Sequence, residues 1–213
     1  KGVFFMNTKE NILLIALRLF AQKGYESVSV EAIANKIGVT KGALYRHYKN
    51  KRDIFDSIVK KMEQMDAEYA QKSGVPEETA EQAPDEYKNI SPEQIVNYTE
   101  LQFIYWTEKE FSSLFRKMLT IEQYHDQEMS RLHQQYLASG PIEYVSDLFL
   151  SITHQKDIAE QLALEFYSPV FLLYSVYDGA TDKKKVTDML QRHLSNFKRK
   201  LSEYEQQGKE GCK

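Results

Sequence analysis

Residues 29–51 read SVEAIANKIGVTKGALYRHYKNK, and their pattern predicts two short helices that cross at a steep angle over a tight turn. Ala34 is small enough to let the second helix approach the first, and Gly38 tolerates the left-handed backbone of the turn. Leu44 follows six residues later and closes the corner from the second helix. The spacing of these three residues predicts a helix-turn-helix.

The second of these helices concentrates positive charge. Residues 39–51 contain five bases when His47 is counted, two tyrosines and no acid. Free backbone N–H groups at the start of the helix suit phosphate, Lys41 can reach a phosphate or a guanine edge, and Gly42 lets the backbone approach closely. The alternative is a solvated basic turn with structural tyrosines, as we expect for Tyr48. The side chains that offer donors to flanking phosphates are Tyr45, Arg46 and His47.

Charge is divided unevenly along the chain. The whole sequence has 28 Lys and Arg against 31 Asp and Glu, a net charge of −3, but residues 1–61 hold 12 of the bases and 5 of the acids. Residues 62–213 are strongly acidic as a consequence. A basic N-terminal segment on an acidic body indicates an anion-binding module attached to a second part, although an accidental surface asymmetry would give the same pattern.

Hydrophobic periodicity is typical of helix almost throughout, so we expect an all-α protein with about nine or ten helices. The N-terminal three helices form a helix-turn-helix domain, and the rest form a C-terminal helical bundle. Residues 74–92, which are acidic and contain prolines, are expected to be a connection. Gly140-Pro141 and Asp178-Gly179 are expected to divide helices. The expected helices are approximately 8–23, 30–37, 40–47, 51–72, 92–108, 109–122, 126–138, 141–152, 156–177 and 183–205.

The stretch LFAQKGYESVSVEAIANKIGVTKGALYRHYKNKRDIF closely resembles the DNA-binding signature of TetR-family transcriptional regulators, with a match over residues 8–56. The resemblance implies a homodimer that binds double-stranded DNA and a C-terminal domain whose small-molecule ligand weakens operator binding. It also implies a DNA-binding domain at 6–52 and a ligand-binding and dimerisation domain at 53–205, linked by the helix at 51–72, with a tail at 206–213. The implied DNA contacts are Thr40, Lys41, Gly42, Tyr45, Arg46, His47 and Lys51.

Two further sets of apolar residues are candidates for the ligand and the dimer. An apolar or aromatic effector would be lined by aromatic and methionine side chains, although ordinary helical core explains each one equally well. The last two long helices carry apolar faces that could pair with a second copy or pack within the chain. The ligand candidates are Met62, Met65, Phe103, Trp106, Phe115 and Tyr124. The dimer candidates are Phe166, Phe171, Tyr174, Leu190, Leu194, Phe197 and Leu201.

Other kinds of site find little support in the sequence. Glu122 and His125 form an E-x-x-H pair, but a di-iron carboxylate site needs a second such pair. Cys212 is the single cysteine, which suits a reducing cytoplasm and gives no zinc site, and we expect no metal or cofactor. The sequence contains no run of 18 apolar residues, so we expect no membrane span. Residues 1–6 are too short for a signal peptide, and we expect Met6 to be the natural start.

Three functions remain open at this stage. The first is a ligand-responsive regulator, a repressor more often than an activator, that binds a palindromic operator as a dimer. The second is a constitutive DNA-binding protein without an effector, which a bound small molecule or a closed apolar cavity would exclude. The third is an enzyme on a helical bundle, but no set of catalytic residues supports it, and we expect that the chain is not an enzyme.

Overall fold

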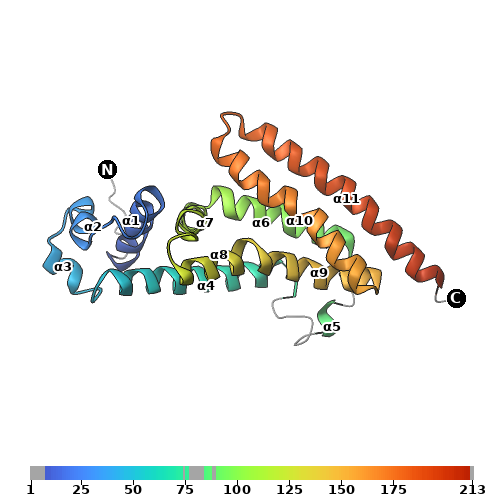
Figure 1. Ribbon diagram of the computed structural model, residues 1–213, viewed down its shortest axis with the longest axis horizontal. Helices are drawn as coiled ribbons and strands as arrows, with labels where there is room; N and C mark the ends of the chain where they lie inside the picture. The colour runs from blue at the N-terminus through green and yellow to red at the C-terminus, as the bar shows by residue number, and fades with distance from the viewer. Residues whose placement is uncertain (1–7, 74, 77–83, 88–89, 212–213) are drawn as a thin grey trace. The chain divides into compact units, whose positions relative to one another are not determined.

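The computed structural model describes residues 8–73, 75–76, 84–87 and 90–211 of the chain. The regular elements in this part of the chain are all helices, which confirms the predicted all-α class (Figure 1). They are α1 (Thr8–Lys23), α2 (Val30–Ile37), α3 (Lys41–Tyr45), α4 (Lys51–Ser73), α5 (Pro84–Tyr87), α6 (Pro92–Glu108), α7 (Glu110–Glu122), α8 (Gln127–Leu137), α9 (Ser139–Thr153), α10 (Lys156–Gly179) and α11 (Lys183–Gly211).

Several predicted boundaries are wrong. The third helix ends at Tyr45 rather than His47, and the short α5 lies inside the expected connection. Gly140 and Pro141 lie in the first turn of α9, where proline removes no intrahelical hydrogen bond. A Cβ atom at Gly140 would lie 2.1 Å from the Gln135 carbonyl oxygen, so this glycine permits a close approach of the backbone rather than a break.

The end of α10 is also later than predicted, because Asp178 and Gly179 are its last two residues and the break follows them. Three predictions fall outside the described residues. These are Met6 as the natural start, Cys212 in the tail, and most of the connection, over 77–83. Among the described helices, none is both long and apolar enough to cross a membrane.

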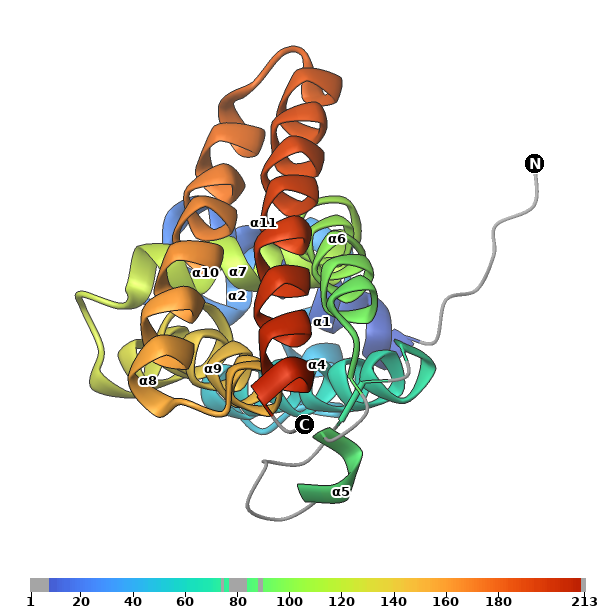
Figure 2. The same ribbon diagram turned by 90° about the vertical axis from the view of Figure 1, so that its right-hand side faces the viewer.

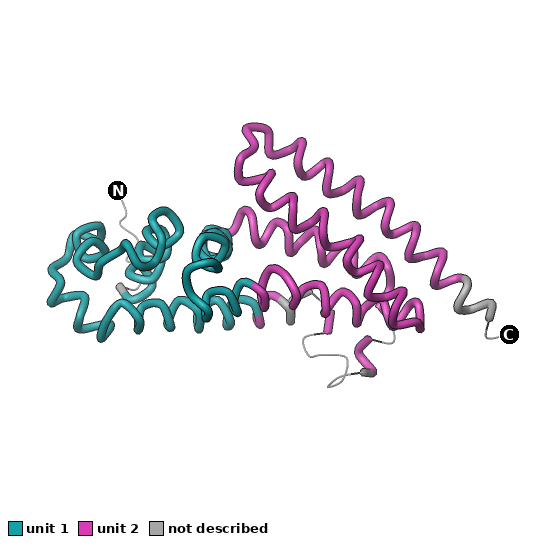
Figure 3. The backbone as a smooth tube through the Cα atoms, viewed as in Figure 1, with its two compact units in different colours: residues 1–66, 110–133 teal, residues 67–109, 134–213 magenta. Residues whose placement is uncertain are grey.

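The chain forms two compact units, and each is built from two segments (Figure 3). The first unit contains residues 1–66 and 110–133, and the second contains 67–109 and 134–213. Residues 110–133 therefore belong with the N-terminal helices although they follow α6 in the chain. The functional division at residue 52 stays a prediction.

In the first unit, α1 supplies the centre of the core. Its apolar face recurs at helical spacing, and α7 packs against it. Gly24 ends the helix at φ +82°, and its N–H donates to the Phe20 carbonyl at 2.9 Å. Phe115, on α7, is fully buried in the same unit. The buried residues of α1 are Ile12, Leu13, Ala16, Leu17, Leu19 and Phe20.

In the second unit, α10 and α11 lie side by side and run antiparallel (Figure 2). Phe166 of α10 packs with Phe149 of α9 and Phe197 of α11, at ring-centroid distances of 5.4 and 4.9 Å. His193 of α11 lies with Nε2 2.8 Å from the Phe166 carbonyl oxygen. These aromatic contacts form the centre of the three-helix packing.

Candidate nucleic-acid interface

The first helix of the helix-turn-helix is fixed at both ends. The Ser29 hydroxyl accepts a hydrogen bond from the Ala32 N–H at 3.0 Å, which caps the start of α2. Gly38 ends the helix at φ +82°, and its N–H donates to the Ala34 carbonyl at 3.0 Å. A residue with a side chain would be strained in this conformation. The turn therefore has the left-handed glycine that the sequence predicted.

The second helix, α3, starts directly after this turn. The Thr40 hydroxyl caps it by accepting from the Ala43 N–H at 3.1 Å. Leu44 is fully buried, as are Ile33 and Ala34 of α2. These three side chains close the corner between the two helices, as their spacing predicted. The remaining side chains of α3 consequently point away from the core.

The outward face of α3 and of the residues that follow it is basic and exposed. Tyr45 is 44 % exposed, and the Lys41 ammonium lies 5.8 Å from the centroid of its ring. Arg46, His47 and Lys49 are exposed as well. Cations and a phenol that lie together on a short helix and the residues directly after it can contact phosphates or base edges.

Gly42 has no structural need to be glycine. Its backbone is not left-handed, and an added Cβ atom would meet only the Thr40 hydroxyl, at 4.0 Å. Glycine in a helix costs about 0.5–1 kcal/mol relative to alanine, so the fold gains nothing from its presence. The predicted close approach of DNA to the backbone at Gly42 stays a prediction, and the fold offers no other reason for this glycine.

Tyr48 is structural, as predicted. Its ring is buried, and its hydroxyl donates to the Lys9 carbonyl of α1 at 3.2 Å. Burial, with smaller contributions from Asp53 and Glu10, raises the pKa of Tyr48 to about 12, so the phenol stays protonated and able to donate. This bond attaches the residues that follow α3 to α1.

Lys51 differs from the other proposed DNA contacts because its side chain is engaged within the fold. Its ammonium donates to the Tyr25 carbonyl at 2.9 Å and lies 4.2 Å from the centroid of the Tyr25 ring. It also lies 3.7 Å from the Glu26 carboxylate. These contacts favour a structural role for Lys51, which sequence reasoning missed because Tyr25 is 26 residues away.

The predicted ligand residues are divided between the two units. Met62, Met65, Phe115 and Tyr124 belong to the first unit, where Met62 and Phe115 are buried and Tyr124 is 84 % exposed. The other two, Phe103 and Trp106, are buried in the second unit. Their rings pack against Tyr174 and Tyr136, at 5.3 and 6.1 Å between centroids. Their assignment to an effector stays a prediction.

Most of the predicted dimer residues pack within the second unit. Phe166, Tyr174, Leu190, Leu194, Phe197 and Leu201 are buried in a single copy, whereas Phe171 is 43 % exposed. Phe171 belongs to a second apolar set, on the outer face of α10, and Met189 of α11 is exposed too. The helical spacing of this set was visible in the sequence. Spacing alone did not distinguish these residues from the buried face of the same helix. The set, here called the outer face of α10, is Leu164, Phe171, Leu172 and Val176.

The E-x-x-H pair of α7 has another explanation than a metal. Among the residues described, no cluster of three or more His, Cys, Asp or Glu could hold a metal ion. Glu122 is 4 % exposed, and its carboxylate accepts a hydrogen bond from the Tyr25 N–H at 2.9 Å. His125 lies exposed in the link between α7 and α8. Glu122 therefore has a structural contact within the first unit, as a hydrogen-bond acceptor for the backbone of Tyr25.

Comparison with known proteins agrees with this geometry. Residues 12–58 match the family model described as bacterial regulatory proteins, tetR family. Residues 12–58 of the chain thus carry a TetR-family DNA-binding domain. The matched stretch contains all the proposed DNA contacts, from Thr40 to Lys51.

Relatives with curated descriptions match only this TetR-family domain. The chain is 51 % identical over 51 residues to the HTH-type transcriptional regulator AcrR of Shigella flexneri, which is 24 % of either protein. It is 44 % identical over 52 residues to the HTH-type transcriptional repressor BepR of Brucella suis, which is 24 % of this chain and 25 % of that protein. The match thus spans about a quarter of each relative. Both are regulators, in agreement with the expectation that this chain is not an enzyme.

The fold extends the likeness beyond the matched stretch. A transcriptional regulator of the TerR/AcrR family from Aquifex aeolicus superposes with a TM-score of 0.63. The superposition covers 89 % of this chain and 98 % of that one at 18 % sequence identity. At this identity the likeness establishes the fold of the C-terminal helices and not their ligand.

Proposed function

We propose that this chain is a transcriptional repressor that binds double-stranded DNA through the exposed face of α3. The observation that carries the proposal is the glycine at position 42, beside Lys41 and Tyr45 on a capped helix whose other side is buried. A groove-binding helix needs cations and a close backbone approach. A regulator of this kind acts on the chromosome, so we propose a cytoplasmic location.

We further propose that the protein works as a homodimer on a palindromic operator. The five residues of α3 are too few to read a site of genomic specificity alone. Two copies held about 34–36 Å apart would read successive major grooves. The outer face of α10 supports this proposal, because Leu172 is 61 % exposed and the other three members are at least 39 % exposed. A second copy would remove this apolar surface from water.

The proposed effector is a small apolar or aromatic molecule. Support comes from the aromatic side chains on and around α6, where the Tyr105 ring lies 4.6 Å from Tyr69 and 5.4 Å from Trp106. Such rings offer apolar surface and stacking partners to a ligand. An effector would act by binding one conformation better than the other. A protein without an effector would be a constitutive DNA binder.

The test begins with selection of duplexes from a random-sequence pool by the purified wild-type protein. We expect a palindromic sequence to be enriched and bound as a dimer. The enriched duplex then serves in gel-shift titrations of Lys41→Ala and of Lys185→Ala, which removes the same charge from an exposed position on α11. Loss of affinity in Lys41→Ala alone supports the interface. Failure to enrich any sequence would contradict the proposed function.

The effector is tested separately. Small apolar and aromatic compounds are screened by thermal shift, and each compound that stabilises the protein is titrated into the protein–operator complex. A coupling of about 1–3 kcal/mol, which is 5- to 150-fold in operator affinity, is typical of an allosteric effector. Bound compounds that leave operator affinity unchanged would favour the constitutive DNA binder.

A further inference from the structure

The turn between α1 and α2 is held from two sides through the backbone of a single residue. The N–H of Tyr25 donates to Oε1 of Glu122 on α7 at 2.9 Å, and its carbonyl accepts from the ammonium of Lys51 on α4 at 2.9 Å. Each of the two bonds has one charged partner, which strengthens it relative to a hydrogen bond between neutral groups. Tyr25 thus connects α7 with the first turn of α4.

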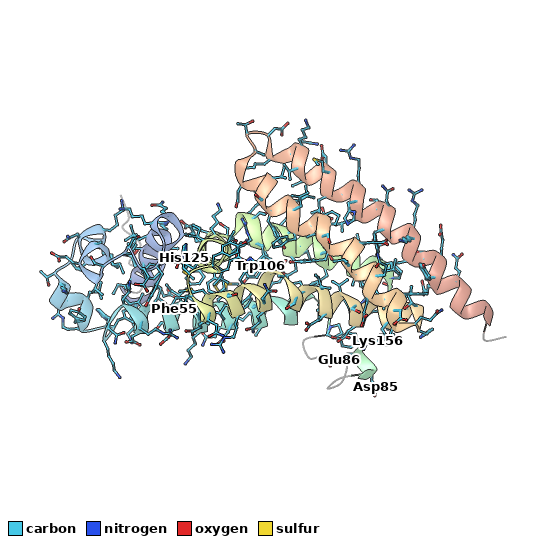
Figure 4. The ribbon with its side chains drawn as sticks, viewed as in Figure 1. Phe55, Asp85, Glu86, Trp106, His125 and Lys156 are labelled. Atoms are coloured by element: carbon cyan, nitrogen blue, oxygen red, sulfur yellow. The ribbon has the colours of Figure 1, made fainter. Side chains whose placement is uncertain are left out.

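Packing around Tyr25 makes this connection specific. Its ring contacts Phe20 of α1 and Phe55 of α4, at centroid distances of 5.1 and 5.4 Å. Phe55 is labelled on α4 in Figure 4. The Glu122 carboxylate also lies directly against Gly24, where a Cβ atom would be 2.7 Å from Oε1. These contacts hold the α1–α2 turn in one position against α4 and α7. The helices α2 and α3 come directly after this turn in the chain.

The carboxylate of Glu122 is poorly placed for stability. It lies at the C-terminal end of α1, where the helix dipole favours a cation, and only 4 % of the residue is exposed. Within the described part of the chain, its one side-chain hydrogen bond comes from the Tyr25 N–H. Burial of a carboxylate for a single bond is costly. A role in holding the turn in one position explains why it is there.

We propose that Glu122 is a positioning residue for DNA recognition: through the Tyr25 N–H it sets the place of the α1–α2 turn, and hence of α3, relative to α7. The inference rests on the proposed function. It makes residues 110–133 part of the DNA-reading machinery, although none of them is proposed to touch DNA. Any movement of α7 would reach α3 through this bond.

Substitutions at Glu122 distinguish the effect of its hydrogen bond to the Tyr25 N–H from the effect of its negative charge. Glu122→Ala removes the acceptor, Glu122→Asp withdraws it by one methylene, and Glu122→Gln keeps an amide oxygen within reach of Tyr25. For Glu122→Ala and Glu122→Asp we expect about tenfold weaker binding of the selected operator, as for one lost hydrogen bond. Affinity for unrelated duplex should stay unchanged, because it depends on phosphate contacts. Glu122→Gln should restore operator affinity.

The control variant is Glu110→Ala, which removes another carboxylate of α7. Its ion pair with Arg18 is about half exposed, so its loss should leave both affinities unchanged. Melting temperatures are recorded for every variant, and the Asp and Gln variants carry the test where Glu122→Ala does not fold.

Three results would overturn the inference: wild-type operator affinity in Glu122→Asp, an equal loss of affinity for operator and unrelated duplex, or a Glu122→Gln variant as weak as Glu122→Asp. A wild-type protein that selects no sequence would instead overturn the proposed function, and the inference with it.

Discussion

The helix-turn-helix and the α10–α11 pair differ in the chemistry of their exposed faces. In α2 and α3 the side chains of Val30, Ile33 and Leu44 are buried, and the outward face carries Lys41 and Tyr45. In α10 one apolar face packs in the core while a second, which includes Leu172, is exposed. An exposed basic face suits a polyanion, and an exposed apolar face suits another protein surface. Under the proposed function, the first region would bind DNA and the second would bind another copy of the chain.

The sharpest way to separate the two apolar faces of α10 and α11 is to place a charge in each. Phe197→Glu puts a carboxylate in the aromatic core and should lower the free energy of unfolding by about 3–5 kcal/mol, measured by urea denaturation. Leu172→Glu lies on the outer face of α10 and should fold but sediment as a monomer. A stable monomer of the wild-type protein at micromolar concentration would remove the outer face of α10 as a dimer interface.

The basic face is tested by substitutions that spare the core. Lys41→Ala and Tyr45→Phe should each weaken operator binding by about 1–3 kcal/mol, because each removes a contact to a base or phosphate. Both side chains are exposed, so melting temperatures should hardly change. Gel-shift titration with the selected operator gives the affinities. Wild-type affinity in both variants would exclude these residues from the interface.

Tyr48 provides the complementary case on the inward side of the same segment. Tyr48→Phe removes the hydroxyl that donates to the Lys9 carbonyl and should lower the free energy of unfolding by about 1 kcal/mol. The loss should have largely disappeared at pH 12. The pKa of Tyr48 is raised to about 12 in the folded state from its ordinary value of 10, so its stabilising effect is complete below pH 10 and is lost as the pH rises to 12. Urea denaturation at pH 8 and pH 12 tests both statements.

The smallest effect is expected for a substitution at Gly42, which should raise stability but lower operator affinity. Gly42→Ala should raise the free energy of unfolding by about 0.5–1 kcal/mol, because alanine favours helix and the site has room for a Cβ atom. The same methyl group should weaken operator binding by holding the backbone away from DNA. Thermal melting and gel-shift titration measure these two effects. A variant that is more stable and binds as well as wild type would contradict the close approach.

Local features of the helix-turn-helix were predictable from sequence, and distant contacts were not. Ala34, Gly38 and Leu44 lie within 11 residues. The turn, and the burial of Leu44 in the corner between the two helices, therefore follow from spacing and backbone conformation alone. The partner of Glu122 is Tyr25, 97 residues away, and no periodic pattern connects them. From the sequence, Glu122 was noted only for its E-x-x-H spacing to His125, and a metal site there found little support.

The C-terminal helices show a second limit of sequence reasoning. Periodicity identified the apolar residues of α10 correctly, but this helix has two apolar faces. Phe166 faces α9 and α11, whereas Leu172 faces solvent in a single copy. Which face a neighbour covers depends on tertiary packing, and spacing along one helix does not contain that information.

The composition of the first unit from two chain segments has a consequence for protein engineering. A fragment that stops at Asp66 would lack α7, whose Phe115, Met118 and Leu119 are buried in this unit. Such a fragment would expose apolar surface and is expected to aggregate. A chimera that grafts this DNA-reading head onto the sensor of another regulator therefore needs residues 110–133 as well as 1–66. Three junctions with the recipient must match, after residues 66, 109 and 133, so exchange of specificities by simple fusion at one point is expected to fail.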